Sequence, residues 1–284
     1  MKLFTTIILF CFVFALFNSC KRDVPLFEIN NLNGNKISCF GNAGMGVGFK
    51  FPINSYESVE PCLRIGADGT ELDVQLTKDS VLVAYHNSDL NESTMCNGTI
   101  NNMLWSDIWG CHYANAFSSS IQIVSLTDLF SNLNNPTNYV YTFDCKLYTA
   151  AADYTAYQNQ FANAIINFKN AHQLRYDQVL IESPDTTFLR ILKNKDENLQ
   201  SFIYPSSFEQ ALDVTKTMGL WGITIDNEKI TANQVKLAHE NGIRVTIWNL
   251  HKDKENTDAI YKSPDYIQSD DIIHLLKVFG KYHQ

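Results

Sequence analysis

Residues 222–250 read GITIDNEKITANQVKLAHENGIRVTIWNL and are the clearest guide to the architecture of the chain. The apolar start, Gly222–Asp226, predicts a short buried strand, and Thr231–Asn241 predicts a helix. Gly242 ends that helix, because glycine readily adopts the left-handed conformation that closes helices. A second apolar run, Arg244–Leu250, predicts the next strand. A strand, a helix and a strand in this order form the unit of a parallel sheet.

The same alternation extends over most of the chain. Apolar residues from Tyr154 to Phe168 recur at steps of three and four, which marks one helical face, and Asp153 precedes them as an N-cap. We therefore predict an α/β fold of the (β/α)8 TIM-barrel type, built on buried parallel strands. The expected strands are Lys36–Phe40, Thr70–Leu76, Val81–His86, Tyr139–Leu147, Gln178–Ser183, Ser201–Pro205, Gly222–Asp226, Arg244–Leu250 and Asp265–Ser269.

These nine expected strands are one too many for an eightfold barrel. Only residues 77–80 join the second strand to the third, whereas a parallel crossover needs about ten or more residues. Either the two form a hairpin-like excursion or another expected strand is wrong. The stretch from about 87 to 138 is rich in Asn, Ser, Trp and Gly, and we interpret it as an insertion after the third strand. We expect one domain over residues 36–283.

The composition of the 284 residues excludes several classes of protein. Apolar residues make up 45% and charged residues 18%, which is typical of a folded globular chain rather than a disordered one. The formal net charge of −8 argues against nucleic acid as the main ligand, because binding a phosphate backbone requires a basic surface. It also argues against adhesion to an anionic lipid surface by charge alone.

The N-terminus has the pattern of an export signal, with Lys2 followed by an apolar run from Leu3 to Phe17. Cys20 comes next after small polar residues and resembles the lipidated cysteine of a bacterial lipoprotein. We therefore expect a signal peptide over 1–19, a lipid on Cys20 and a tether over 20–35. This places the protein in the bacterial cell envelope, lipid-anchored on its periplasmic side or in the outer membrane. A plain secreted protein and an uncleaved anchor are the alternatives.

The cysteine pattern fits an exported protein. No pair has the C-x-x-C spacing of a zinc or thioredoxin site. Cys96 and Cys111 lie in one polar stretch at a spacing that suits a disulfide in an oxidising compartment. Alternatively, these two and Cys39, Cys62 and Cys145 are all small buried apolar residues.

Polar residues gather where the expected strands end, which is where TIM barrels carry their active sites. Glu71 and Asp73 share one face of a strand, and Asp144 and Lys146 repeat that spacing. Converging carboxylates repel one another unless a cation or shared protons intervene, and oxygen ligands favour Ca²⁺ or Mg²⁺ over zinc. Taken singly, each residue is better explained as a strand cap or a structural partner. Further strand-end residues are His86, Glu182, Ser183 and Trp248.

Residues 66–87, GADGTELDVQLTKDSVLVAYHN, resemble the signature of glycerophosphodiester phosphodiesterases, G-A-D-x-[IV]-E-x-D-V-x-x-T-x-D followed by a short strand and H-D. Weaker similarity continues at 144–146, 247–249 and 264–270, so that the resemblance covers the expected domain. It implies a TIM barrel with a small insertion after the H-D strand. It also implies hydrolysis of a glycerophosphodiester to glycerol 3-phosphate and an alcohol, with a divalent cation, Ca or Mg, as cofactor.

Carried over by position, the resemblance implies roles for individual residues. His86 is the implied general acid or base, a task suited to imidazole because it titrates near neutral pH. Lys146 is implied to contact phosphate or to orient the ligands. The implied metal ligands are Glu71, Asp73 and Asp144, the last of which stands where the family has a Glu. The candidates for substrate positioning are Asn42, Lys146 and Trp248.

The chain departs from the family pattern most at residues 41–46, GNAGMG. There Asn42 replaces a catalytic histidine and Ala43 a phosphate-binding arginine, while Ile53 replaces a Glu and Asn87 the Asp of H-D. An amide does not titrate at working pH, so Asn42 can position a substrate oxygen but cannot transfer a proton. One general acid or base contributes roughly 10²- to 10⁴-fold in rate.

Two hypotheses follow from the retained and the replaced residues. The first is a phosphodiesterase of reduced activity that acts on a small phosphodiester and reaches the membrane through its lipid. The second is a catalytically impaired barrel that binds or senses a ligand as a lipoprotein. A different reaction at the same mouth, such as a lyase or sugar-phosphate reaction, is a third alternative. Neither nucleic acid binding nor a particular oligomeric state is indicated.

Overall fold

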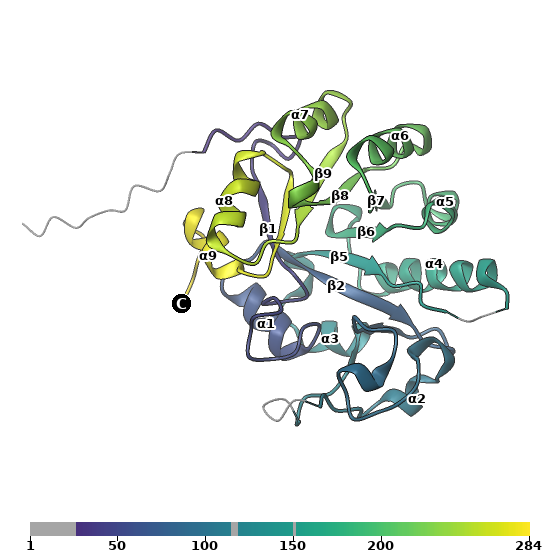
Figure 1. The fold of residues 1–284 in the computed structure, drawn as a ribbon. Coiled ribbons are helices and arrows are strands. Elements are labelled where there is room, and N and C mark those ends of the chain that lie inside the picture. The colour runs from purple at the N-terminus through teal and green to yellow at the C-terminus, as the bar shows by residue number, and fades with distance from the viewer. Residues whose placement is uncertain (1–26, 115–118, 150–151) are drawn as a thin grey trace, which may run out of the picture.

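Eight parallel strands form a closed barrel in the computed structural model, which describes residues 27–114, 119–149 and 152–284 (Figure 1). The hydrogen-bonded order is β1, β10, β9, β8, β7, β6, β5, β2, and β2 pairs again with β1, which closes the ring. This confirms the predicted TIM barrel. The strands are β1 (Ser38–Gly41), β2 (Gly69–Leu76), β5 (Val140–Cys145), β6 (Val179–Ser183), β7 (Gln200–Ile203), β8 (Gly222–Asp226), β9 (Arg244–Trp248) and β10 (Tyr266–Ser269).

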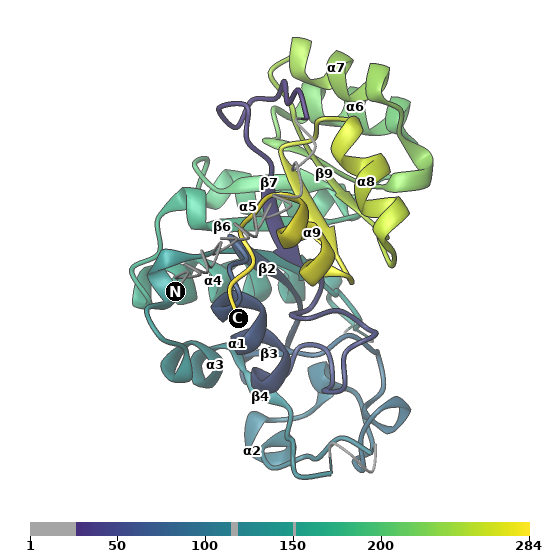
Figure 2. The same cartoon turned by 90° about the vertical axis from the view of Figure 1, so that its left-hand side faces the viewer.

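Helices cover the outside of the barrel (Figures 1 and 2). The stretch 222–250 folds as predicted into β8, α7 and β9, with Gly242 in the left-handed region at φ 72°. Asp153 caps α4 as predicted, because its side chain accepts a hydrogen bond from the Ala156 amide at 2.9 Å. The helices are α1 (Tyr56–Arg64), α2 (Trp105–Ile108), α3 (Leu126–Asn132), α4 (Tyr154–Ala171), α5 (Thr186–Lys195), α6 (Phe208–Met218), α7 (Ala232–Glu240), α8 (Asp253–Tyr261) and α9 (Ile272–Val278).

The ninth expected strand forms the hairpin-like excursion. β3 (Leu82–Ala84) runs antiparallel to β2, and β4 (Val124–Ser125) runs antiparallel to β3. A disulfide joins Cys96 and Cys111, whose Cα atoms are 6.0 Å apart. Figures 1 and 2 show this part of the chain, with α2, projecting beyond the ring of helices. It has its own apolar core, whose members include Leu90, Ile100, Ile108, Tyr113 and Ile123.

The end of the predicted insertion belongs to the barrel instead. α3 leads from the excursion back to β5, and Leu126, Leu129 and Phe130 on this helix lie in the main core. Ser125 caps the helix, because its hydroxyl accepts a hydrogen bond from the Asp128 amide at 3.0 Å. The helix has only seven residues and runs into an Asn-rich turn. Because residues 87–138 are polar overall, the short apolar face of α3 could not be recognised from the sequence.

The described part of the predicted tether, residues 27–35, lies against the barrel. The Asn31 side chain donates to the Pro264 carbonyl at 2.7 Å, and the Leu32 amide donates to Asp265 Oδ1 at 2.8 Å. Asp265 is fully buried beside β10; the Val245 amide donates to its Oδ2, and Leu32 supplies the donor for its Oδ1. The fold thus starts ahead of the expected boundary at residue 36.

The remaining N-terminal predictions fall on residues that the structure does not describe. The expected signal peptide, residues 1–19, and the expected lipidated Cys20 both lie there, and they stay predictions. Among the described residues, no helix has the length and apolar character needed to cross a membrane.

The barrel interior changes from apolar to polar toward the carboxyl ends of the strands. The lower layer consists of Phe40, Leu180, Phe202 and Tyr266. Tyr266 stacks on Phe40 and meets Phe202 edge to face. Two residues further along β6 and β10, Glu182 and Gln268 share the same interior face as this layer, because side chains alternate along a strand. An aromatic layer therefore supports a polar one, and the polar layer is the floor of a pocket.

Candidate active site

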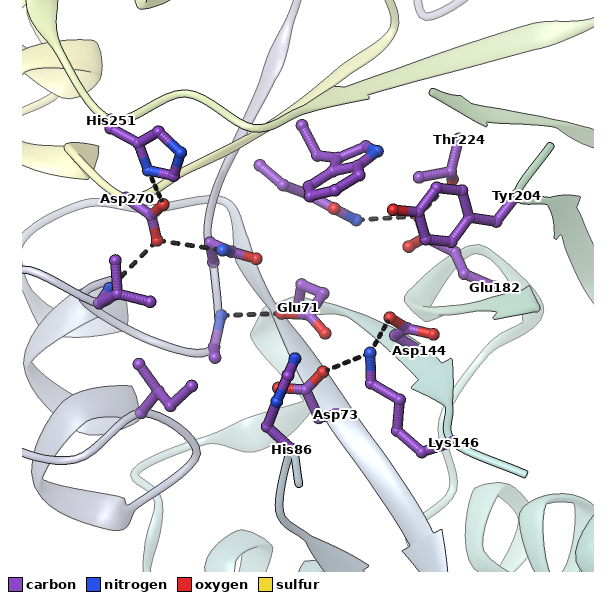
Figure 3. A pocket seen from close by; sticks show the side chains of 16 residues that line it. Glu71, Asp73, His86, Asp144, Lys146, Glu182, Tyr204, Thr224, His251 and Asp270 are labelled. Atoms are coloured by element: carbon purple, nitrogen blue, oxygen red, sulfur yellow. Dashed lines mark hydrogen bonds and ion pairs between the residues drawn. The ribbon is translucent and has the colours of Figure 1, made fainter. Parts of the chain in front are cut away.

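A pocket of about 390 Å³ opens at the carboxyl ends of the barrel strands (Figure 3). The structure brings together there all the residues that the sequence suggested for catalysis, metal binding and substrate positioning. The lining residues are Asn42, Ala43, Val47, Ile53, Glu71, Asp73, His86, Asp144, Lys146, Glu182, Tyr204, Thr224, Trp248, His251, Gln268 and Asp270.

Three carboxylates form the acidic centre of the pocket. Glu71 and Asp73 stand two residues apart on β2, and the register of β2 with β5 places Asp144 directly beside Asp73. One carboxylate oxygen of each lies within 4.8 Å of the others. Burial, followed by repulsion from Asp73 and Asp144, raises the pKa of Glu71 well above its usual value. Strand positions, rather than loops, hold this cluster together.

A divalent cation fits these three side chains. Glu71 Oε2 accepts a hydrogen bond from the Ala43 amide at 2.8 Å, but Glu71 Oε1 is buried with no hydrogen-bond partner among the described residues. Such an oxygen is costly unless an ion or a proton meets it. The donors are all carboxylate oxygens, which suit Ca²⁺ or Mg²⁺ better than zinc.

Lys146 binds two members of the cluster. Its Nζ lies 3.0 Å from Asp73 Oδ1 and 2.7 Å from Asp144 Oδ2. Burial alone would lower the pKa of Lys146, but the charges of Asp144 and Asp73 outweigh burial and raise that pKa above its usual value. The lysine therefore stays charged and partly neutralises the three carboxylates.

Asn54 fixes the orientation of Asp73, a task that sequence reasoning did not assign. Its Nδ2 donates to Asp73 Oδ2 at 2.7 Å, and its Oδ1 accepts from the Asp73 amide at 2.9 Å. Asn54 is fully buried, with a left-handed φ of 64°. The signal in the sequence was its place in Pro52–Ser55, which resembles the family segment P-E-N-T.

His86 lies in the loop after β3 and faces the same pocket. Its Nδ1 is 2.7 Å from Asn87 Oδ1, and Asn87 Nδ2 donates to Ser93 Oγ at 2.9 Å. Because the amide nitrogen of Asn87 donates to Ser93, its oxygen faces the ring and accepts a hydrogen bond from Nδ1–H. That tautomer leaves Nε2 of His86 as the nitrogen that can accept a proton.

Glu182 lies at the polar floor of the pocket. Its Oε1 accepts hydrogen bonds from Thr224 Oγ1 at 2.5 Å and from Gln268 Nε2 at 2.8 Å. Burial raises its pKa to about 8, against the effect of the Thr224 hydrogen bond. Sequence reasoning noted Glu182 at a strand end but gave it no role.

The side of the pocket next to β1 is built differently. The Asn42 side chain donates to Asp270 Oδ1 at 3.0 Å, and the Val47 amide donates to the same oxygen at 3.1 Å. His251 Nδ1 lies 2.5 Å from Asp270 Oδ2. A dashed line marks this pair in Figure 3. His251 lies outside the matched motifs, and its position three residues after Trp248 was the only signal for it in the sequence.

Aromatic rings form another wall of the pocket. Trp248 ends β9, and its ring meets that of Tyr204 edge to face with centroids 5.2 Å apart. Its Nε1 is buried and has no hydrogen-bond partner among the described residues. Trp248 therefore offers a free N–H donor to a ligand, which agrees with its predicted place in substrate positioning.

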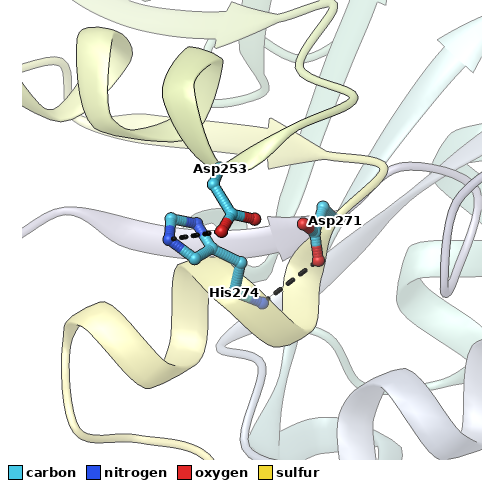
Figure 4. Close-up of side chains that lie close together, drawn as sticks. All are labelled: Asp253, Asp271 and His274. Atoms are coloured by element: carbon cyan, nitrogen blue, oxygen red, sulfur yellow. Dashed lines mark hydrogen bonds and ion pairs between the residues drawn. The ribbon is translucent and has the colours of Figure 1, made fainter.

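A second group of acidic side chains and a histidine lies away from the pocket (Figure 4). Asp271 caps α9 by accepting from the His274 amide at 3.2 Å. His274 Nε2 lies 3.7 Å from Asp253 Oδ2, and the Asp253 side chain is 76% exposed. Helix capping and one exposed ion pair account for this group without a metal ion.

Comparisons with known proteins identify relatives of this chain. The model of the Glycerophosphoryl diester phosphodiesterase family matches residues 46–277. A glycerophosphodiester phosphodiesterase from Caldanaerobacter subterraneus is 22% identical over 237 residues, which cover 81% of this chain and 93% of that protein. The Bacillus subtilis uncharacterized protein YqiK is 34% identical over 92 residues, which cover 31% of this chain and 38% of that protein.

Solved structures share the fold. A phosphodiesterase from Oleispira antarctica, solved in complex with the product sn-glycerol-3-phosphate, has a TM-score of 0.74 at 15% identity. The superposition covers 86% of this chain and 96% of that chain. Because the family model spans well over half of the 284 residues, the chain belongs to the glycerophosphoryl diester phosphodiesterase family.

Proposed function

We propose that this protein hydrolyses a glycerophosphodiester to glycerol 3-phosphate and an alcohol. The observation that carries the proposal is the buried cluster of three carboxylates, with its unpartnered Glu71 oxygen, in the same pocket as His86. Membership of the family supports the reaction class. The glycerol 3-phosphate bound to the Oleispira antarctica phosphodiesterase supports the product.

Each group has a task in that reaction. Glu71, Asp73 and Asp144 would hold a divalent cation, which would supply positive charge for the phosphoryl oxygens. Lys146, fixed by two of these carboxylates, adds a positive charge that suits an anionic substrate. His86 is oriented through Nδ1, so its Nε2 can take a proton from an attacking oxygen.

An enzyme-coupled assay for glycerol 3-phosphate tests the proposal. The purified protein is incubated with glycerophosphodiesters in Ca²⁺ or Mg²⁺, and in parallel with a chelator. We expect release of glycerol 3-phosphate that requires the cation. A folded protein that releases none with any divalent cation contradicts the proposal.

The second candidate function is binding without turnover on the same barrel. Asn42, Ala43 and Ile53 favour it, because all three line the pocket where the family resemblance leads us to expect a histidine, an arginine and a glutamate. This function predicts that titration calorimetry detects binding of glycerol 3-phosphate with the cation, while hydrolysis is absent. Robust hydrolysis that disappears in Glu71→Ala excludes it.

We also propose that the protein is a bacterial envelope lipoprotein, with residues 1–19 removed and a lipid on Cys20. The pattern of the first twenty residues supports this placement. A disulfide between Cys96 and Cys111 agrees with an oxidising compartment. Labelled palmitate should enter the full chain in a bacterial host, and Cys20→Ser should abolish the label.

A further inference from the structure

His251 occupies an unusual position at the rim of the pocket. It follows β9, lines the pocket, and has a side chain that is 48% exposed. Nδ1 lies 2.5 Å from Asp270 Oδ2, and Nε2 lies 2.7 Å from Asn249 Oδ1. An oxygen acceptor is therefore within reach of each ring nitrogen.

The partners of His251 are themselves fixed. Asn249 Nδ2 donates to Asp226 Oδ2 at 3.0 Å, so Asn249 presents its oxygen, not its nitrogen, to the ring. Asp270 is 4% exposed, and its other oxygen is taken by Asn42 and by the Val47 amide. His251 Nδ1 thus lies beside a buried carboxylate oxygen, Asp270 Oδ2, that accepts no hydrogen bond from the described residues.

The surroundings of His251 carry further negative charge. The His251 amide donates to Glu255 Oε2 at 2.6 Å, so that carboxylates of Glu255 and Asp270 both contact this residue. An imidazole that lines the pocket can, in its protonated form, bind a phosphate oxygen and give up a proton there.

His251 and His86 approach the pocket from opposite sides of β1. In the closed ring β1 lies between β2 and β10. His86 follows β3, which pairs with β2, whereas His251 is bound to Asp270, directly after β10. Attacking and leaving oxygens are roughly in line across a phosphorus atom, so two proton-transfer groups on opposite sides match that geometry.

We propose that His251 is the general acid of this pocket and supplies the imidazole that Asn42 lacks. The assignment rests on the proposed hydrolysis. A water oxygen forms the new bond to phosphorus and passes one proton to His86 Nε2. The bond from phosphorus to the alcohol oxygen breaks, that oxygen keeps the electron pair, and it takes a proton from His251. Exchange of one proton with solvent at each ring restores both starting forms.

The test uses two substrates that differ only in the leaving alcohol, namely glycerol 3-phosphate esters of choline and of p-nitrophenol. Nitrophenolate leaves without protonation, whereas choline needs a proton from an acid. We expect His251→Gln to lower kcat on the choline ester about 10²-fold or more, and on the nitrophenyl ester less than about tenfold. His274→Gln, which removes an imidazole outside the pocket, is the matched control and should leave both rates unchanged.

A double variant and a spectroscopic measurement complete the test. Asn42 already donates to Asp270, so Asn42→His in the His251→Gln background should recover part of the choline-ester rate. In the wild-type protein, ¹⁵N NMR of the histidine rings should show protons on both nitrogens of His251, a readout that stands even where the variant does not fold.

The outcomes separate this assignment from the proposed function. An active wild type whose His251→Gln variant is equally active, or equally impaired on both esters, overturns the assignment alone. A neutral His251 ring in the NMR spectrum also overturns it. A wild-type protein that hydrolyses neither ester overturns the proposed function, and the assignment falls with it.

Discussion

The two sides of the pocket differ in how they are built. On the β2 and β5 side, the charged residues Glu71, Asp73 and Asp144 occupy successive inward positions of strands, and the sheet register fixes them. On the β1 side, Asn42 and Asp270 sit in loops just beyond the strands. The strand side keeps a carboxylate at each position where the family resemblance leads us to expect one, whereas the loop side has Asn42 and Ala43 where it leads us to expect a histidine and an arginine. Strands of the barrel therefore hold the candidate metal-binding carboxylates in fixed positions, whereas the loops can carry different side chains.

The backbone of the β1 loop nevertheless stays tightly constrained. Gly44 has φ 98°, and a Cβ there would lie 2.8 Å from the Ser58 carbonyl oxygen. Gly46 has φ 86°, and a Cβ there would meet the Asp270 backbone at 2.4 Å. Only glycine fits such positions. The path of the loop is thus held by glycines, while the side chains of Asn42 and Ala43 determine which groups this loop offers to the pocket.

The largest expected effect is on the strand side, in Glu71→Gln. Removing one of three charged oxygen ligands should weaken divalent-cation binding by more than about 100-fold, because the loss of outer-shell contacts alone costs 10- to 100-fold. Titration calorimetry with Ca²⁺ and Mg²⁺ measures this effect. Asp253→Asn, in the exposed group of Figure 4, is the matched control and should bind as the wild type does. Equal weakening in both variants would mean that the cation does not bind at the strand-side cluster.

The next effect is on the free energy of unfolding, and it compares the loss of a buried lysine with the loss of an exposed one. Lys146→Met leaves Asp73 and Asp144 without their buried cation, so in chelator the free energy of unfolding should fall by about 3 kcal/mol. Added Ca²⁺ should restore much of the loss, because it neutralises the same carboxylates. Urea unfolding with and without Ca²⁺ measures both quantities.

Lys236→Met provides the matched control for that experiment. Lys236 makes an exposed pair with Glu240 at 3.9 Å, and its loss should change stability by less than about 0.5 kcal/mol. If Lys146→Met is no less stable than this control, the strand side of the pocket does not hold a buried cluster of charged carboxylates.

The parts of the fold and site that lie on strands were predictable from sequence. The spacing of Glu71 and Asp73 needs only the alternation of side chains along a strand. Asp144 follows once its strand is placed next to β2, and the barrel itself follows from repeated strand–helix units. Such features depend on local periodicity, which a single sequence contains.

Features that depend on contacts between distant loops were not predictable. His251 and Asp270 come together only because β9 and β10 are neighbours and their loops turn toward β1. The docking of residues 27–35 depends on Asp265, more than 200 residues away. Helix α3 was missed for a different reason, since its seven residues are too few for a clear helical period.

The last expected effect, a change in the pH dependence of stability, lies at the floor that both sides share. Glu182 has a usual pKa of 4.5 and a folded-state pKa of about 8, because burial disfavours its charge. The folded state therefore holds this proton more tightly than the unfolded chain does. The stabilisation is complete below about pH 4.5 and is lost as pH rises through 8. In chelator, the free energy of unfolding should fall over this window in the wild type, and fall less in Glu182→Gln.

Urea unfolding at several pH values measures that slope, with the exposed Glu197→Gln as the matched control. The slope does not vanish in Glu182→Gln, because burial also raises the pKa of Glu71, which acts in the same direction. Glu182 binds Thr224 on β8 and Gln268 on β10, so its proton influences the strand side and the loop side together. If Glu182→Gln leaves the slope of unfolding free energy against pH unchanged, the whole pH dependence belongs to the strand-side carboxylates. Glu182 would then not connect the two sides of the pocket.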